Sequence, residues 1–64
     1  MMEAKITENN VEYTVIIDTD GNKYWFLDNK LHREYGPAIE FITGEKEWYL
    51  NDKLLTQEEF NEID

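Results

Sequence analysis

The residues best suited to chemistry are His32 and Arg33, which lie next to each other near the middle of the chain. A histidine can act as a general base, and an arginine can clamp a phosphate. Serine and cysteine nucleophiles to go with them are missing, because the sequence contains neither residue. The pair stands shortly before Gly36-Pro37, a combination typical of a turn. We therefore favour a structural role, in which Arg33 pairs with a carboxylate and His32 packs in or caps the loop.

Acidic residues are the other candidates for chemistry. Asp18, Asp20 and Asn22 alternate around Gly21, a pattern with a faint similarity to a calcium-binding loop. The EF-hand pattern also needs a glutamate at its twelfth position and flanking helices, and neither is found. A single histidine without cysteine argues against a zinc site. Two neighbouring carboxylates could hydrolyse a glycoside, but with fifteen acids in 64 residues some proximity is inevitable. We predict no catalytic residue, no metal and no cofactor.

The formal net charge is −9, from fifteen acidic and six basic residues. Such a field repels phosphates, so we expect no direct binding to nucleic acid or to an anionic membrane. It favours a partner protein with a basic surface, for example one whose groove normally holds nucleic acid. The alternative is that the acids keep an aromatic-rich chain soluble. We find no signal peptide and no apolar stretch of membrane-spanning length, so we expect a cytoplasmic location.

Two similar stretches organise the chain, GNKYWFLDNKL at 21–31 and GEKEWYLNDKL at 44–54. Gly, Lys, Trp, Leu, Lys and Leu recur at the same places, with an offset of 23 residues. This repeat predicts two β-hairpin units, at about 14–36 and 37–55, within a single domain that spans 1–64. A chain of this length without cysteine must be stabilised by aromatic burial, strand pairing or association.

Alternating apolar and β-branched residues predict the clearest strand from Val11 to Asp18. Turn signals separate further strands at about 1–7, 23–28, 38–42 and 46–50. Near the end, Thr56 to Glu59 fits a helix capping box, and Phe60 and Ile63 share one helical face. We predict a mainly β (β-rich α+β) fold. It is an antiparallel meander of about five to six short strands from two β-hairpin repeats, with a short C-terminal helix at about 57–63.

One inconsistency concerns the strand before each turn. Alternation puts Val15 and Ile17 inside in the first copy, but Ile39 and Phe41 inside in the second. These faces disagree by one residue, because the offset pairs Val15 with Ala38, Ile16 with Ile39 and Ile17 with Glu40. Either a bulge intervenes, or the two strands are not equivalent.

Aromatic residues on the repeated strands form a candidate binding surface. Tyr24, Phe26 and Tyr49 are predicted to lie opposite the face of Trp25 and Trp48. If one face forms the core, the other must be covered by the C-terminal helix, by a second copy of the chain or by a target. Exposed aromatics surrounded by acids suit a protein interface. The predicted partner-binding residues are Tyr24, Phe26, Tyr49, Glu45, Glu47, Asp28 and Arg33.

The run from Trp25 to Ala38, WFLDNKLHREYGPA, resembles a known repeat. It is similar to the W-Y-x-N-G-K-x-H-R-x-D-G-P-A pattern of small bacteriophage and large-virus proteins, which is loosely related to MORN-type β-hairpin repeats. The resemblance covers roughly 21–60. It departs from the pattern where Asn29 and Asp52 replace the turn glycine and Tyr35 replaces an aspartate. The resemblance implies β-hairpin architecture and a viral source, and it implies no reaction.

The sequence therefore favours a non-enzymatic, acidic protein-binding module. We expect a phage-encoded inhibitor that docks on a basic surface of a host defence or nucleic-acid-binding protein in the host cytoplasm. Anti-CRISPR and anti-restriction proteins have a similar size and charge, which is an analogy of class. A self-associating structural or accessory viral protein, such as a homodimer, is the alternative. A small-ligand sponge is the third hypothesis.

Overall fold

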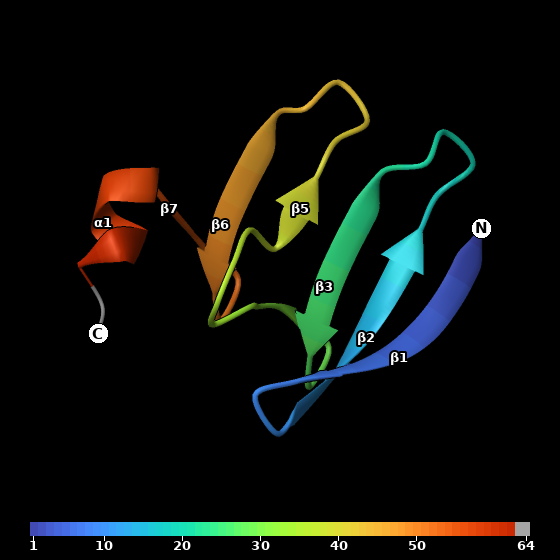
Figure 1. The fold of residues 1–64 in the computed structure, drawn as a ribbon, viewed down its shortest axis with the longest axis horizontal. Coiled ribbons are helices and arrows are strands. Elements are labelled where there is room, and N and C mark those ends of the chain that lie inside the picture. Colours follow the sequence, from blue (N-terminus) through green and yellow to red (C-terminus); the bar gives the residue numbers. More distant parts are fainter. Residues whose placement is uncertain (63–64) are drawn as a thin grey trace.

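The computed structural model describes residues 1–62, which form one antiparallel sheet of seven strands and a single helix. The strand order is β1-β2-β3-β5-β6-β7, and β4 pairs with the end of β3. Figure 1 shows the sheet as one curved layer with the helix at its far end. The predicted mainly β meander with a short C-terminal helix is confirmed. The elements are β1 (Met2–Glu8), β2 (Val11–Ile17), β3 (Lys23–Leu27), β4 (Lys30–Leu31), β5 (Ile39–Glu40), β6 (Lys46–Leu50), β7 (Lys53–Leu55) and α1 (Gln57–Asn61).

Three two-residue turns of one kind join β1 to β2, β3 to β4 and β6 to β7. Their central residues are Asn9-Asn10, Asp28-Asn29 and Asn51-Asp52, all with φ between 50° and 68°. After glycine, Asn and Asp adopt this left-handed conformation most readily, and hairpins of this length require it. Asn29 and Asp52 therefore serve as turn residues without being glycine. Within residues 1–62, no helix has the length and apolar character to cross a membrane.

The hairpins β2–β3 and β5–β6 are built in the same register, so the offset of 23 residues also holds before each turn. Their turns match as well, because the Gly21 and Gly44 N–H groups donate to the carbonyls of Asp18 and Phe41. Both glycines have positive φ, 95° and 97°. No bulge separates the two copies. The matching strand pairs are Ile16–Tyr24 with Ile39–Glu47, and Ile17–Lys23 with Glu40–Lys46.

This equal register corrects the faces predicted for the second copy. Ala38 takes the place of Val15, and both side chains are fully buried in the same cluster. Ile39 is buried, as predicted, but it lies on the face opposite Ala38 and outside the central cluster, so only the face predicted for it is wrong. Phe41, also predicted to point inward, lies in the turn beyond the end of β5.

A charged residue, Glu40, occupies the inward position that Ile17 has in the first copy. Its carboxylate accepts a hydrogen bond from Trp25 Nε1 at 3.2 Å and lies 3.6 Å from Arg33 Nη1. A partly buried carboxylate is stable only with such partners. The alternation of apolar residues failed here because a polar cluster takes the place of an apolar side chain.

The core lies on one face of the sheet, which we call the core face. Tyr13, Val15, Trp25 and Ala38 form its centre, and each is at most 6% exposed. The Tyr13 and Trp25 rings meet edge to face with centroids 5.4 Å apart, an arrangement that aromatic quadrupoles favour. The loop 32–38 crosses this face. Among the described residues, the centre of the core is therefore closed by a loop and not by a second layer of regular structure.

Helix α1 packs at the other end of the core face. Thr56 Oγ1 accepts from the Glu59 N–H at 3.0 Å, and Glu59 accepts from the Thr56 N–H at 2.9 Å, which confirms the predicted capping box. Phe60 anchors the helix against Trp48, with ring centroids 6.4 Å apart. The helix ends at Asn61, and Ile63, the second predicted anchor, lies outside the described residues.

Candidate functional site

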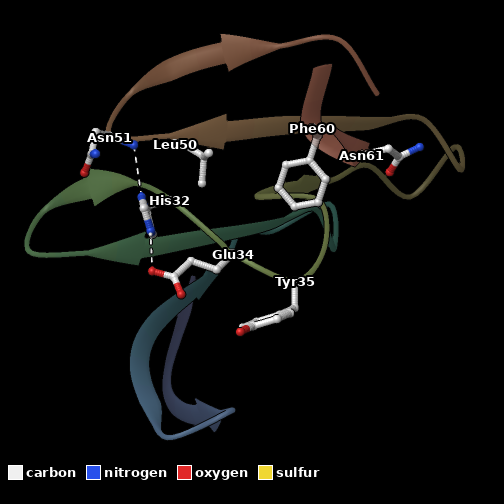
Figure 2. A pocket seen from close by; sticks show the side chains of 7 residues that line it. All are labelled: His32, Glu34, Tyr35, Leu50, Asn51, Phe60 and Asn61. Atoms are coloured by element: carbon white, nitrogen blue, oxygen red, sulfur yellow. Dashed lines mark hydrogen bonds and ion pairs between the residues drawn. The ribbon is translucent and has the colours of Figure 1, made fainter. Parts of the chain in front are cut away.

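A hollow beside His32 lies between the 32–38 loop, the end of β6 and α1 (Figure 2). His32 is buried, and its Nδ1 accepts a hydrogen bond from the Asn51 N–H at 3.0 Å. Its Nε2 therefore carries the hydrogen, and it lies 3.2 Å from the Glu34 carboxylate. A general base needs a free lone pair, but the fold already uses the one on His32. The hollow holds a structural histidine, as the sequence favoured. The lining residues are His32, Glu34, Tyr35, Leu50, Asn51, Phe60 and Asn61.

Arg33 is also committed to the fold. Its Nε and Nη2 donate to the two carboxylate oxygens of Glu8 at 3.1 and 2.8 Å, and its guanidinium lies 3.6 Å from the Trp25 ring centroid. These hydrogen bonds, and then the positive charge itself, hold the pKa of Glu8 below its usual value, against an opposing effect of burial. The Arg33 side chain is only 14% exposed and is held by the fold, so it offers little surface to a partner.

The Gly36-Pro37 step completes the clamp around Arg33. A Cβ on Gly36 would lie 2.9 Å from Arg33 Cζ, which is too close for real atoms. Arg33 Nη1 donates to the Pro37 carbonyl at 3.2 Å. The guanidinium thus lies between the Trp25 ring and the backbone of the loop. The segment HREYGPA therefore closes the core by holding Arg33 over Trp25.

The other face of the sheet, which we call the aromatic face, carries Ile16, Tyr24, Phe26, Ile39 and Tyr49. The register places Ile16, Tyr24, Ile39 and Glu47 in one row across four strands. Because side chains alternate along a strand, Phe26 shares the face of Tyr24, and Tyr49 that of Glu47. The structure thus brings Tyr24 and Phe26 to one face, and alternation along β6 adds Tyr49 beside Glu47. Tyr49 also packs against the core cluster, so it is held more tightly than the other two.

No second layer covers the aromatic face within residues 1–62. The loop 32–38 contacts the core face through Arg33 over Trp25 and through the Glu34 N–H, which donates to the Tyr13 hydroxyl at 3.2 Å. Helix α1 contacts Trp48, which also belongs to the core face. Ile39 is 7% exposed, while the other apolar side chains of the aromatic face are half-buried. A shallow hollow beside Phe26 is lined by Glu3, Lys5, Thr14, Ile16, Phe26 and Asn29.

Each tyrosine of the aromatic face is tied to a carboxylate. The Tyr24 hydroxyl donates to Asp18 at 2.8 Å, and the Tyr49 hydroxyl donates to Glu47 at 3.1 Å. Hydrogen bonds from the side chain of Asn22, from Tyr24 and from two backbone N–H groups lower the pKa of Asp18 to about 2. A carboxylate is therefore held beside each ring. The strand residues of the aromatic face include three acids and one cation, so the face is negatively charged. They are Glu3, Glu12, Glu47 and Lys5.

The predicted acids Asp28 and Glu45 are exposed in turns at opposite ends of the strands, outside the central row. Sequence reasoning missed Ile16 and Asp18. Ile16 could have been found from the alternation of β2, where it shares a face with Thr14. Asp18 could have been found from its place at the start of the turn, because an aspartate there typically accepts a hydrogen bond from the N–H two residues on, here that of Asp20.

Residues 1–62 contain no group of three His, Asp or Glu side chains arranged to hold a metal ion. No family model, no curated protein and no solved structure matches the chain. Its own geometry makes it a small domain of two β-hairpin repeats with a closed core face and an open aromatic face.

Proposed function

We propose that this chain is a non-enzymatic protein-binding domain that docks through its aromatic face on a basic surface of a partner. One observation carries the proposal: carboxylates are fixed beside half-buried aromatic rings on a sheet face that no other layer covers within residues 1–62. Tyr24 with Asp18, at 2.8 Å, is the clearest such pair.

The two kinds of group would act at different stages of binding. The net charge of −9 attracts a basic partner over a distance and raises the association rate. Aromatic anchors such as Tyr24 and Phe26 supply binding energy once water is excluded. Glu47 accepts the Tyr49 hydroxyl through Oε1, so its Oε2 can accept from a lysine or an arginine of the partner. Asp18 acts through its charge, because its two oxygens already accept four hydrogen bonds. The face therefore combines steering and anchoring.

The partner class follows from the sign of the charge. An acidic surface resembles the phosphate backbone in charge, so a protein with a nucleic-acid-binding groove is the best-matched partner. Together with the resemblance to phage and large-virus repeats, this supports an inhibitor of a host defence or nucleic-acid-binding protein. The host cytoplasm is the corresponding location.

The test is capture of partners from a bacterial lysate on immobilised protein. Each variant of the aromatic face is compared with a control variant elsewhere that carries the same kind of substitution. Phe26→Ser and the pair Glu12→Lys/Glu47→Lys change the aromatic face. Their controls are Tyr35→Ser, at an exposed tyrosine of the loop, and Glu58→Lys/Glu62→Lys, on and just after α1. Circular dichroism and thermal unfolding establish that each variant is folded.

We expect a retained protein that is lost with both face variants and kept with both controls. Duplex DNA should compete with it. NaCl at about 1 M should release it, because the Debye length is then about 3 Å. If nothing is retained at low salt, or if the controls lose the protein equally, the proposal is wrong. Concentration-dependent sedimentation without any captured protein would favour the self-associating alternative.

A further inference from the structure

Strand β1 lies at one end of the sheet, and only one of its two edges is paired. It pairs with β2 along all 7 of its residues, and within residues 1–62 no strand pairs with its other edge. Helix α1 packs on β6, at the opposite end of the sheet (Figure 1). Four strand spacings separate β1 from β6, about 19 Å in all. The two residues that follow Glu62 span at most about 7 Å, so they cannot reach this edge.

The free edge of β1 presents the backbone groups of alternate residues. The Asp18 N–H donates to the Asn22 carbonyl at 3.0 Å, so the even-numbered residues of β2 bond to β3 and the odd-numbered ones bond to β1. Each odd-numbered residue of β2 faces an even-numbered residue of β1. The N–H and C=O groups of Glu3, Lys5 and Thr7 therefore point away from the sheet, where an added strand would bind them.

The side chains of β1 alternate between apolar and charged residues. Met2 and Ile6 share the side of the core, because their cross-strand partners belong to the core cluster or pack against it. They are nevertheless 69% and 38% exposed. Glu3 and Lys5 lie on the aromatic face, with Lys5 Nζ 3.9 Å from the Glu3 carboxylate. An added strand would therefore meet apolar side chains on one side and a mixed pair of charges on the other.

We propose that the free edge of β1 binds the same edge of a second copy of this chain, antiparallel and with Ala4 of the two copies face to face. In this register Glu3 of each copy lies opposite Lys5 of the other, and Met2 lies opposite Ile6. Opposite charges and apolar residues that face each other across two strands stabilise a sheet. A two-fold axis relates the copies, so each of these pairs occurs twice.

The charges of β1 select this register among the alternatives. The centre of a two-fold antiparallel pair falls on one residue, because side chains that face each other must lie on the same side of the sheet. A pair centred on Lys5 would bring two lysines together, and one centred on Glu3 would bring two glutamates together. Like charges directly opposite each other are destabilising. The pair centred on Ala4 also leaves Glu8 free to bind Arg33 of its own chain.

A second copy accounts for the lysine at this edge. Edge lysines commonly prevent unwanted strand pairing, and Lys5 would oppose pairing in the register centred on itself. In the register centred on Ala4 the same lysine is attractive. Each copy has one β1, so association stops at two. The contact is small and the two net charges of −9 repel each other, so we expect a weak dimer.

The dimer places both aromatic faces on the same side of one continuous sheet. A two-fold axis perpendicular to a sheet leaves each face on its own side. A basic partner that is long enough would contact both faces at once, which raises the apparent affinity without any new contact. This consequence rests on the proposed function, whereas the dimer does not, and its test uses no partner.

The experiment combines sedimentation and NMR of the ¹⁵N-labelled chain from about 10 μM to about 1 mM, a range suited to a small interface. We expect a reversible equilibrium between monomer and dimer without larger species. The amide signals of Glu3, Lys5 and Thr7 should shift with concentration, because their N–H groups gain partners. A monomer at the highest concentration, larger oligomers, or shifts that leave β1 unchanged would overturn the proposal.

An exchange of the two charges tests the register. Lys5→Glu alone and Glu3→Lys alone each place like charges opposite each other, so each should weaken the dimer at least about tenfold. The double variant Glu3→Lys/Lys5→Glu restores opposite charges and should dimerise like the wild type. Lys30→Glu, the same charge change at an exposed residue of β4, is the control and should weaken the dimer much less.

Thermal unfolding establishes that each of these variants is folded. A double variant that stays monomeric would overturn the register, as would a control that weakens the dimer as much as Lys5→Glu. Single variants that dimerise like the wild type would overturn it too. The concentration-dependent shifts of the wild type need no variant, so they test the edge even if a substitution unfolds the chain.

Discussion

Arg33 joins three parts of the molecule that are far apart in the sequence. It binds Glu8 at the end of β1, lies over Trp25 of β3 and contacts the loop at Pro37. Arginine suits this position because its planar guanidinium can bind a carboxylate with two hydrogen bonds and stack on a ring at once. The guanidinium fits between the Trp25 ring and the loop only because Gly36 has no side chain. Closure of the core therefore depends on this glycine.

Gly36→Ala tests that space. We expect it to lower the free energy of unfolding by about 1–3 kcal/mol, a typical cost of overpacking, because the new Cβ would meet the guanidinium at 2.9 Å. Urea unfolding of wild type and variant measures the difference. The control is Gly44→Ala, where no heavy atom lies within 4 Å and the cost is backbone strain at a φ of +97°.

The source of the Gly36→Ala loss can be assigned with a second variant. In an Arg33→Lys background the loss should shrink, because the flexible lysine can move away from the new methyl group. An equal loss in both backgrounds, or a Gly36→Ala protein as stable as the wild type, would contradict the clamp described above.

Asp18 makes stability depend on acid pH. The fold lowers its pKa from 3.8 to about 2, chiefly through the hydrogen bond from the Asn22 side chain. A lowered pKa means that its contribution is present above about pH 4 and is lost as the pH falls toward 2. Asp18→Asn should be less stable than wild type at about pH 6, and the difference should shrink at about pH 2.5. Chemical unfolding at both pH values, with Asp20→Asn as control, checks this; a difference that does not change with pH would refute it.

Among the structural elements, the three similar turns offer a matched comparison. Asn10 and Asp52 both have φ 68°, so glycine relieves equal strain at either position. Asp52 also accepts the Leu31 N–H at 2.7 Å. We expect Asn10→Gly to be neutral or slightly stabilising and Asp52→Gly to cost about 1–2 kcal/mol, since it leaves that donor without its partner. Thermal unfolding of the two variants decides; equal effects would mean that the Asp52 contact is dispensable.

The elements that the sequence predicted are those defined by neighbours along the chain. Turn residues, the capping box at Thr56 and the alternation of β2 act over four residues or fewer. The inward position of Glu40 could not be predicted in this way. It depends on Trp25 and Arg33, which reach it from another strand and from the loop.

The same limit applies to the candidate site. Alternation brought Tyr24 and Phe26 to one face. It could not separate Arg33 from the surface, because the partner that withdraws this side chain, Glu8, is 25 residues away in the sequence. Contacts at that separation depend on how the strands are ordered, and composition does not reveal that order.

For the whole molecule, the net charge of −9 acts within a radius of gyration of 11.3 Å. At low salt the Debye length exceeds this size, so the acids repel one another in the folded state. Raising NaCl at pH 7 should stabilise the domain by about 1 kcal/mol, or 4–8 °C in melting temperature. Near the isoelectric point of about 4.3 the same salt should have little effect. A melting temperature that falls with salt at pH 7 would show that ion pairs outweigh repulsion.

The equal register of the two hairpins determines how the gene can change in length. A duplication of residues 33–55, inserted after Leu55, would give every new strand the neighbours that its original has. The sheet would grow by one unit while β1 and α1 remained its ends, as in other repeat architectures. An insertion of another length within a strand would place its hairpin out of register. Duplication of a whole unit is therefore the change of length that this register accommodates without breaking a strand pairing.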